Sequence, residues 1–375
     1  MSDPIPLNAA PDELERRLER LPGIDRVRAA AAGEDVFLVG GAVRDLLLGR
    51  ERADLDLVVE GDVRSLAAAL GDNVRGHARF GTATIRVGDL TVDVASARAE
   101  SYPTPGALPE VRPATIAEDL GRRDFTINAM ALPLHAEPRL LDPHAGLGDL
   151  GERLLRILHP GSFSDDPTRA LRAARYAARM SLRLEPATAE ALAAADLGTV
   201  SADRVTAELR RIASEEDPAR ALALGREWGL IEIADERLCL VDDVRKLLER
   251  PEWAMVAERT DAVLAAATGD LSSARSLTAR SSPEPSRAVE AAHGHAGTDL
   301  ALARAMGAEW LDPYVAEWRG IRLEIGGSDL LEAGVSEGPQ IGRGLRAALR
   351  AKLDGELPGG RDAELRAALE AARES

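Results

Sequence analysis

Residues Val36–Val59 read VFLVGGAVRDLLLGRERADLDLVV, and this stretch decides how the chain around it folds. The apolar run Val36–Val39 predicts a short buried strand. Gly40-Gly41 predicts a sharp turn after it, because residues without Cβ let another group approach the backbone closely. The composition of Ala42–Leu48 predicts a short helix. A second apolar run, Leu55–Val59, predicts another strand, so the unit is strand, glycine turn, helix and strand.

Two carboxylates stand at the entrance to that second strand. Residues i and i+2 of a strand share one face, so Asp54 and Asp56 have Cα atoms about 6–7 Å apart and converge beside the glycine turn. A helix N-terminus presents free N–H groups to phosphate, and Arg44 adds a cation. Paired carboxylates suit Mg²⁺, and two such ions about 3.5–4 Å apart assist in-line phosphoryl displacement. A tight turn with two solvated acids is the alternative, but the combined context favours the phosphate and metal site.

The composition is that of a globular protein of two or three domains. The chain has 375 residues, 45% of them hydrophobic and 29% charged, which is ample for a core. Cys239 is the single cysteine, which excludes an intrachain disulfide and a multi-cysteine zinc site. The N-terminus lacks the apolar core of a signal peptide, and no apolar run approaches the ~20 residues of a membrane span. We therefore expect a cytoplasmic protein without membrane contact.

The formal net charge is −16. A charge of this sign argues against a protein that coats nucleic acid through its overall charge. It leaves room for RNA binding by a local basic face, so the distribution of charge matters more than its sum.

A third carboxylate, Asp93, lies in a predicted hairpin. Residues Ala83–Ala95 form two alternating runs around Gly88-Asp89, a pair suited to a tight turn. Asp93 is thus a strand carboxylate that can join Asp54 and Asp56. An exposed polar face of an antiparallel strand is an equally good interpretation.

A long loop is predicted between this hairpin and the next charged cluster. Residues Ala97–Leu120 are rich in Pro and Gly, and long loops in compact domains tend to be functional or mobile. Arg122, Arg123 and Asp124 then precede an apolar segment. Arginine suits a triphosphate, and aspartate suits ribose hydroxyls. An ordinary surface ion-pair group is the alternative, which this cluster on its own favours.

The segment SFSDDPTRALRAARYAARM, residues 162–180, predicts a helix that begins with Ser164 as its N-cap. Arg169, Arg172 and Arg175 recur at every third position and so share one broad helix face. A solvated basic stripe is the alternative for these three arginines.

The pair Asp166 and Arg169 argues against that alternative. Cytosine and adenine both show an amino donor beside an unprotonated ring nitrogen on their pairing edge. A carboxylate accepts from the amino group, and a guanidinium donates to the nitrogen. Uracil and guanine present the reverse order, and rejection is strong when a wrong base leaves buried polar groups unpaired. One Asp and one Arg on a rigid helix can therefore select C and A without a nucleic-acid template.

The second half of the chain is mainly helical. The pattern is helical from Val200 to about Leu264, and Ala265–Gly297 predicts variable helix and linker. Ser328 is expected to cap a later helix, and Gly338-Pro339 to open another. A basic flank on the helix that Gly338-Pro339 opens suits an RNA phosphate backbone, although a solvated face is equally consistent. Its members are Arg343, Arg346, Arg350 and Lys352.

Together these residues resemble the class II tRNA nucleotidyltransferase and bacterial poly(A) polymerase family. The matching segments fall in order from about Leu38 to Ala178. They are LVGGAVRDLLLG, Asp54-Leu-Asp56, GRRDFTINAMA, Leu-Asp-Pro with the following glycines, and DDPTRALRAARYAA. GGSDLLEAGVSEGPQIG is a weaker match near the end. The resemblance is specific over the first half and loose over the rest.

The resemblance implies an α+β protein. Its N-terminal nucleotidyltransferase (DNA polymerase β-like) head would contain a mixed sheet, followed by an all-helical neck, body and tail. We assign residues 1–30 to an N-terminal helix, 31–150 to the catalytic head, 151–220 to a neck that recognises the base, and 221–375 to a body and tail that bind tRNA.

The resemblance also implies a set of site residues. Asp54 and Asp56 would hold two Mg²⁺ ions, with Asp93 as a further catalytic carboxylate. The residues implied to bind the incoming nucleotide are Gly40, Gly41, Arg44, Arg123, Asp124, Asp166, Arg169, Arg172 and Arg175. An RNA 3′-hydroxyl would attack the α-phosphate of CTP or ATP and release pyrophosphate.

One residue departs from the family pattern. The family usually has Glu-Asp-x-x-Arg on the neck helix, whereas the outer acid here is Asp165. Asp166 and Arg169 are retained, so we expect CCA addition to the tRNA 3′ end. The alternatives are A addition, CC addition, a poly(A) polymerase, or a non-catalytic nucleotide- or RNA-binding protein of the same fold. A Rossmann dehydrogenase would need Gly-x-Gly-x-x-Gly, which is missing here. No protein partner is evident.

Overall fold

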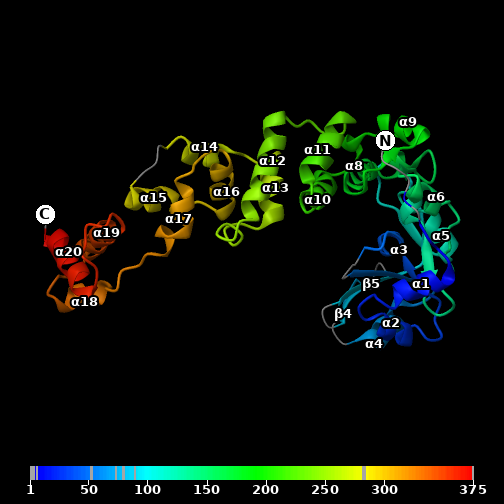
Figure 1. Ribbon diagram of the computed structural model, residues 1–375, viewed down its shortest axis with the longest axis horizontal. Coiled ribbons are helices and arrows are strands. Elements are labelled where there is room, and N and C mark those ends of the chain that lie inside the picture. Colours follow the sequence, from blue (N-terminus) through cyan, green and yellow to red (C-terminus); the bar gives the residue numbers. More distant parts are fainter. Residues whose placement is uncertain are drawn as a thin grey trace. The chain divides into compact units, whose positions relative to one another are not determined.

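The computed structural model describes residues 5, 7–50, 54–71, 74–77, 81–87, 90–280 and 284–373. The chain divides into two compact units (Figure 1). The first contains Met1–Leu209 and Arg220–Glu232, and the second contains Arg210–Ala219 and Ile233–Ser375. This division into two compact units does not test the four predicted parts, which are N-terminal helix, head, neck, and body with tail. The four-part assignment stays a prediction.

A six-stranded mixed sheet with strand order β3-β4-β5-β2-β1-β8 organises the first unit. Its strands are β1 Val36–Val39, β2 Asp54–Val59, β3 Val74–His77, β4 Thr82–Val87, β5 Leu90–Ser96 and β8 Ala131–Pro133. β2 and β5 pair in parallel, and the other neighbouring pairs are antiparallel. A mixed sheet followed by a mostly helical remainder is the predicted α+β class, which is confirmed.

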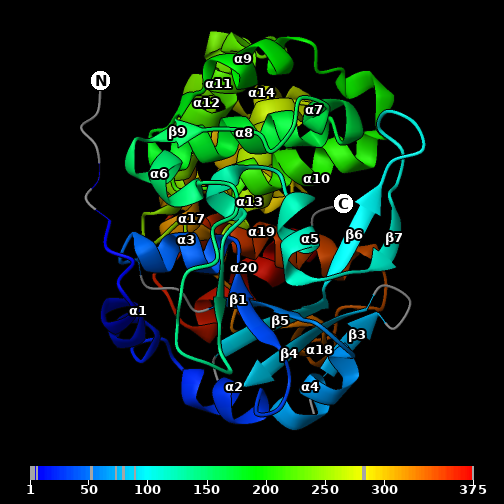
Figure 2. The same cartoon turned by 90° about the vertical axis from the view of Figure 1, so that its right-hand side faces the viewer.

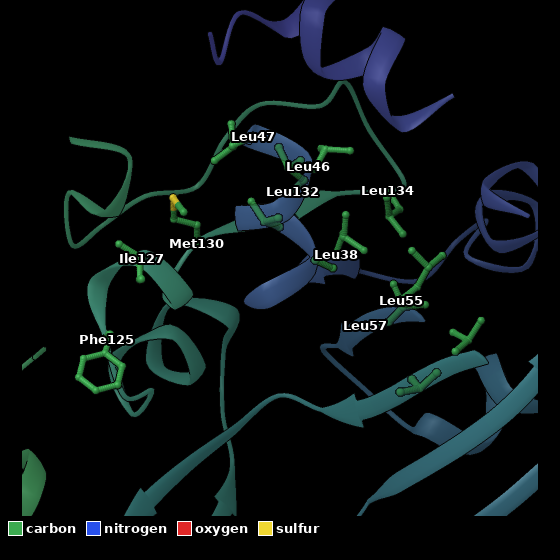
Figure 3. Close-up of a cluster of buried hydrophobic side chains, with 14 of the residues drawn as sticks. Leu38, Leu46, Leu47, Leu55, Leu57, Phe125, Ile127, Met130, Leu132 and Leu134 are labelled. Carbon is green, nitrogen blue, oxygen red and sulfur yellow. The ribbon is translucent and has the colours of Figure 1, made fainter. Parts of the chain in front are cut away.

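One face of this sheet is covered by the first four helices. They are α1 Pro11–Leu18, α2 Ile24–Ala30, α3 Gly41–Leu47 and α4 Val63–Leu70. Leu55 and Leu57 of β2 are buried there with Leu38 of β1 and Leu46 of α3, as Figure 3 shows. Every second residue of β2 therefore belongs to a continuous apolar core.

The opposite face of the sheet is the one that carries acids. Val58 is buried there with Phe37 of β1 and Leu120 of α5, which spans Ile116–Gly121. Because side chains alternate along a strand, Asp56 shares this face with Val58. The apolar core on one side thus fixes which way Asp56 faces.

The stretch that organises the fold forms the predicted elements. β1 covers Val36–Val39, and α3 begins at Gly41, one residue before the predicted start. β2 begins at Asp54, so the predicted apolar strand includes its acidic entrance. The Gly88-Asp89 turn lies outside the described residues, although β4 and β5 on its two sides pair as an antiparallel hairpin.

The long loop predicted at Ala97–Leu120 is wrong. The segment forms an antiparallel ribbon of β6 Arg98–Ser101 and β7 Glu110–Pro113, followed by α5 (Figure 2). Both strands carry polar, exposed or half-buried side chains, so they show none of the apolar alternation that marks a strand. A signal for α5 was present, because Thr115 and Glu118 form a capping box at its start.

The helix predicted to begin at Ser164 is also different. Residues Ser162–Asp165 form a short helix α7, and the long helix α8 starts at Thr168 and ends at Met180. Asp166 between them is extended, with φ −136° and ψ 92°. A residue before proline is pushed away from the helical region, which explains the break before Pro167. Asp166 itself accepts the hydrogen bond of the Thr168 N–H at 3.0 Å.

The remaining elements are short or helical. In residues 121–232 they are η2 Thr126–Asn128, α6 Gly146–Gly151, β9 Leu154–Leu155, β10 Arg183–Leu184, α9 Pro186–Ala193, η3 Leu197–Thr199, α10 Ala202–Ala213 and α11 Pro218–Glu227. Later come α12 Asp235–Leu248, α13 Arg259–Thr268, α14 Ser272–Thr278, α15 Pro285–Ala292, α16 Gly297–Ala305, α17 Leu311–Ala316, η4 Trp318–Gly320, α18 Gly327–Glu332, α19 Pro339–Leu353 and α20 Arg361–Arg373. Among the described residues, no helix has the length and apolar character to cross a membrane.

The second half of the chain differs from the sequence predictions at two places. The segment Ala265–Gly297, predicted as variable helix and linker, contains the complete helices α14 and α15. Ser328 is not a cap, because α18 begins one residue earlier with Gly326 at the N-cap position. There the Asp329 carboxylate accepts from the Gly326 N–H at 2.6 Å, which is the contact that an acid in the first turn makes with the N-cap backbone.

The α19–α20 pair yields a first prediction. A Cβ on Gly344 would lie 2.4 Å from the Ala368 carbonyl oxygen, whereas one on Gly342 would meet only the flexible Arg346 guanidinium at 3.3 Å. We expect Gly344→Ala to destabilise the chain by about 1–3 kcal/mol through overpacking. Gly342→Ala is the matched control and should be neutral or stabilising by up to about 1 kcal/mol, since alanine favours a helix interior. Urea unfolding followed by circular dichroism measures both; equal effects would contradict the tight helix crossing.

Candidate active site

The parallel pairing of β2 and β5 brings acids from two strands together. Asp56 lies directly opposite Asp93 in the register, and Asp54 lies opposite Thr91. Thr84 of β4, opposite Asp93 on its other side, donates its hydroxyl to Asp93 Oδ1 at 2.5 Å. The side chain of Asp54 lies outside the described part. Asp56 and Asp93 therefore stand side by side on the sheet face away from α1–α4.

The donor set fits a hard divalent cation. Among the side chains that the structure describes, no group of three His, Cys, Asp or Glu is arranged as a metal site. Asp56 and Asp93 nevertheless offer oxygen ligands from neighbouring strands. Carboxylate oxygens are what Mg²⁺ prefers, so the chemistry of these two residues suits that ion.

The glycine turn makes room for an arginine. Gly40 has φ +60° and precedes α3, and a Cβ on it would lie 2.6 Å from Nη1 of Arg123. The backbone conformation requires glycine there, and a Cβ would push the end of the Arg123 side chain aside. Arg123 is thus held against the turn that the sequence analysis assigned to phosphate.

Asp119 of α5 holds this arginine and its neighbour in place. Its Oδ1 accepts from Arg122 Nη2 at 2.7 Å, and its Oδ2 accepts from Arg123 Nη2 at 2.9 Å. Burial alone would raise the pKa of the Asp119 carboxyl, but the charges of Arg123 and Arg122 outweigh burial and hold it below its usual range. Sequence reasoning missed Asp119 because its segment was taken for a loop, although its spacing of three and four residues from Arg122 and Arg123 is that of ion pairs on one helix face.

A second buried carboxylate, Asp124, joins the head to α8. Its Oδ2 accepts from Arg172 Nε at 2.8 Å and Nη2 at 2.6 Å. Its Oδ1 accepts from Asn128 Nδ2 at 3.0 Å. Burial alone would raise the pKa of Asp124, yet the Arg172 charge and these hydrogen bonds bring the pKa down to about 2. Both oxygens already accept, so a ribose contact by Asp124 stays a prediction and would compete with these partners.

Arg44 is almost fully buried at 1% exposure and also touches this network. It donates to Asp45 Oδ1 at 2.9 Å and to Asn128 Oδ1 at 2.5 Å. Its guanidinium lies 5.3 Å from the ring centre of Tyr176 on α8, and that of Arg175 lies 4.6 Å from it. An aromatic face attracts cations, so Tyr176 gathers arginines whose mutual repulsion it reduces. Tyr176 was read from sequence only as part of a helix.

The residues predicted to read the base come from the start of α8. Asp166 Oδ1 accepts from the Thr168 hydroxyl at 2.6 Å and from Arg204 Nη2 at 2.8 Å. Arg169 is buried and donates to the Ser162 hydroxyl at 2.7 Å and to the Arg122 carbonyl at 2.8 Å. Asp166 and Arg169 therefore make separate contacts instead of pairing with each other.

Most of the groups described above face one cavity of about 700 Å³, whereas Asp119 and Arg204 support it from outside the lining. Every head and neck residue predicted for the site lines it, apart from Asp54 with its undescribed side chain. These are Gly40, Gly41, Arg44, Asp56, Asp93, Arg123, Asp124, Asp166, Arg169, Arg172 and Arg175. The described lining contains eight arginines and five carboxylates, although the whole chain carries −16. The cavity is therefore a local basic site that suits a polyanion.

Tyr102 and Glu100 from the β6–β7 ribbon also line this cavity. The Tyr102 hydroxyl donates to Glu100 Oε2 at 3.0 Å, and Glu100 Oε1 accepts from Arg122 Nη1 at 2.9 Å. Burial and the Glu100 charge raise the pKa of the Tyr102 phenol to about 12. The segment taken for a loop thus supplies a wall of the site.

The basic residues of α19 lie in the other unit, and two of them serve its packing. Arg343 donates to the Ala371 and Ala372 carbonyls at 3.3 and 3.2 Å, and Lys352 pairs with buried Glu364 at 2.6 Å. Arg346 and Arg350 are exposed. RNA binding by this set stays a prediction.

Known proteins share both this head and the fold of the whole chain. Residues 36–156 match the poly A polymerase head domain family. A solved structure of a CCA-adding enzyme in an apo form is 25% identical, covers 98% of this chain and 100% of its own, and has a TM-score of 0.76. A Thermotoga maritima CCA-adding enzyme complexed with tRNA is 26% identical, covers 98% of this chain and 99% of its own, and has a TM-score of 0.71.

The chain is similar to members of the class II tRNA nucleotidyltransferase family. Within it, an A-adding tRNA nucleotidyltransferase of Halalkalibacterium halodurans is 45% identical over 52% of this chain and 49% of the relative. One of Geobacter sulfurreducens is 33% identical over 89% of this chain and 45% of the relative. A CC-adding tRNA nucleotidyltransferase of Deinococcus radiodurans is 43% identical over 55% of this chain and 57% of the relative. The chain thus spans about half the length of these nucleotidyltransferase relatives.

Gly40 yields a prediction about the position of Arg123. We expect Gly40→Ala to weaken binding of a nucleoside triphosphate about tenfold or more, because the new Cβ displaces a guanidinium that can make charge-assisted phosphate contacts. Gly49→Ala at the other end of α3 is the matched control. Gly49 has a similar φ of +68° with nothing within 4 Å of a Cβ, so it carries only the backbone strain of about 1–2 kcal/mol. Titration calorimetry decides; equal losses of binding would show that strain alone matters.

The pair Asp124–Arg172 predicts a pH-dependent stability. We expect Asp124→Asn to lower the unfolding free energy by about 1–3 kcal/mol at pH 7, since it leaves the half-buried Arg172 with only the longer Glu208 contact at 3.7 Å. The folded pKa of Asp124 lies at about 2, below its usual value of ~3.9. This contribution is therefore complete above pH 4 and disappears as the pH falls through 2.

Urea unfolding of both proteins between pH 2 and pH 7 measures this difference. Asp62→Asn is the control, because Asp62 pairs with Arg64 at the surface and asparagine also caps a helix. The control should show a much smaller difference. If the difference in unfolding free energy between the unmodified protein and Asp124→Asn stayed constant down to pH 2, the charge pairing would be contradicted.

Proposed function

We propose that this chain is a template-independent tRNA nucleotidyltransferase that adds CCA to the tRNA 3′ end from CTP and ATP and releases pyrophosphate. One observation carries the proposal: a single basic cavity joins the strand acids Asp56 and Asp93 to the helix pair Asp166 and Arg169. Acids that suit phosphoryl transfer and a pair that suits C and A are thus within reach of one nucleotide. Relatives that add A, CC or CCA to tRNA support the same class of activity.

The arginines would take the triphosphate. Arg123 stands over Gly40, and α8 carries Arg172 and Arg175 on the same side of the cavity. Arginine binds phosphate oxygens through two parallel N–H donors, so a fixed guanidinium adds geometry as well as charge. Asp119, on the far side of Arg123 from the turn, keeps that guanidinium in place before the nucleotide arrives.

Asp166 and Arg169 would select the base. All hydrogen bonds from described residues to the Asp166 carboxylate end on Oδ1, so Oδ2 is the oxygen left to accept from an amino group. Arg169 has its position fixed by Ser162 and by the Arg122 carbonyl, and its remaining N–H groups donate to the ring nitrogen. Uracil and guanine would place a protonated ring nitrogen against the Arg169 donors and a carbonyl oxygen against the Asp166 carboxylate.

We assign the metal site to Asp54 and Asp56 with two Mg²⁺ ions. Bound there, the ions would supply charge stabilisation for the attacking and leaving oxygens. Asp93, beside Asp56, is the nearest described carboxylate in the register and is our candidate to receive the proton of the RNA 3′-hydroxyl. The 3′-oxygen forms a bond to the α-phosphorus, the bond from this phosphorus to the β-bridging oxygen breaks, and pyrophosphate leaves.

Addition of A alone is the second candidate. It is favoured by the A-adding relatives, which are 45% and 43% identical over about half of this chain. Asp166 and Arg169 suit both C and A, so the base-reading pair is compatible with either product. We further propose that tRNA is the acceptor, as the tRNA complex of the Thermotoga relative suggests, that the basic face of α19 contributes to RNA binding, and that the enzyme works in the cytoplasm.

The test offers purified protein three tRNAs, ending before CCA, after C and after CC, each with CTP, ATP or both in the presence of Mg²⁺. We expect the first tRNA to be extended by CCA. Asp56→Asn should lower incorporation roughly a thousandfold or more, because a catalytic metal supplies several kcal/mol. Asp25→Asn, an exposed acid on α2, is the control and should retain activity.

The products separate the candidates. Extension only of the CC-ended tRNA, and only with ATP, would refute CCA addition and establish A addition. Long A tails on unrelated RNA would identify a poly(A) polymerase. Activity of Asp56→Asn equal to that of the unmodified protein would contradict the metal assignment, and nucleotide binding without any incorporation would indicate a non-catalytic member of the fold.

A further inference from the structure

Arg204 of α10 makes two hydrogen bonds from one guanidinium. Its Nη2 donates to Asp166 Oδ1 at 2.8 Å, and its Nη1 donates to the Gly106 carbonyl at 2.8 Å. Gly106 belongs to the connection between β6 and β7. Arg204 is absent from the residues that line the cavity, so it touches the base-reading carboxylate from behind.

The Gly106 end of this link is itself fixed. The Gly106 N–H donates to the Ser164 carbonyl at 3.1 Å. Gly106 has φ +71°, and a Cβ on it would lie 2.6 Å from the Thr199 carbonyl oxygen. Only glycine fits this conformation and this closeness. The ribbon tip is thereby set between two neck segments, and Arg204 is anchored at a defined point.

We propose that Arg204 is a positioning residue that sets base selectivity by fixing the rotation of the Asp166 carboxylate. This rests on the proposed function of Asp166. Thr168 bonds Oδ1 through its N–H and its hydroxyl, but both donors lie on the same helix turn and leave the carboxylate free to tilt about that contact. Arg204 approaches from another helix, so it defines a second direction and directs Oδ2 to the base.

Fixing the Asp166 carboxylate affects the rejection of uracil and guanine more than the binding of cytosine and adenine. A carboxylate that tilts can move away from the carbonyl of uracil or guanine and admit a water between them, which reduces the penalty on those bases. Cytosine and adenine hold the carboxylate themselves through their amino donors. Loss of Arg204 should therefore relax rejection more than it weakens binding of CTP or ATP.

The experiment measures kcat/KM for CTP and UTP, and the ratio of their dissociation constants, on the full chain with tRNA ending before CCA. Arg204→Ala should lower the CTP-to-UTP preference about tenfold or more, the scale of one charge-assisted hydrogen bond. Arg204→Lys should restore part of the preference, since one ammonium can reach either acceptor. Arg156→Ala is the matched control: Arg156 pairs with Asp149 and Glu185 away from the cavity, and its loss should leave the preference unchanged.

A ratio taken on one preparation is independent of the folded fraction, so loss of stability alone does not move it. If Arg204 acts through Asp166, adding Arg204→Ala to Asp166→Ala should change the ratio no further. An unchanged preference in Arg204→Ala, or a further loss in the double variant, would overturn the inference. Equal binding of all four nucleotides by the unmodified chain would overturn it too. Absence of extension of any tRNA, with nucleotide preference intact, would instead count against the proposed function alone.

Discussion

The parallel register of β2 on β5 is the constraint on which the site depends. It sets Asp56 opposite Asp93, and the alternation of side chains then turns both away from the helices of the other face. Leu55 and Leu57 secure this orientation, because a shift of one residue would expose two buried leucines and bury the acids. The apolar core thus determines where the carboxylates point.

Around these acids the protein holds arginines by means of buried carboxylates. Asp119 is fully buried and fixes Arg122 and Arg123, while Asp124 fixes Arg172. Burial of an unpaired charge is costly, so each carboxylate is kept ionised by the guanidinium that it orients. Since the guanidinium groups are in place beforehand, an anionic ligand needs little reordering of side chains on binding. This explains how a chain with net charge −16 contains a basic cavity.

The sequence predicted those parts of the fold and the site that depend on residues close together in the chain. The strand, turn and helix of Val36–Leu47 and the acids of β2 depend on residues a few positions apart, and their elements were predicted. The β6–β7 ribbon was not, because its strands pack against the site with polar side chains and lack apolar alternation. Asp119 was missed because its segment was taken for a loop, although Arg122 and Arg123 lie at the helical spacings of three and four residues from it. Arg204 was missed because its contacts are with residues 38 and 98 positions away, which no spacing rule shows.

Asp166 shows how one residue can serve folding and the proposed chemistry together. Pro167 forces it out of the helical region, and its carboxylate then begins α8 by accepting from Thr168. The same constraint keeps Asp166 out of the helix, and its side chain lines the cavity. The side chain of a residue inside α8 would instead lie along the helix surface. One carboxylate oxygen is committed to the helix start and to Arg204, and these donors together set the direction of the other oxygen. The start of α8 and the proposed selection of the base thus depend on the same side chain.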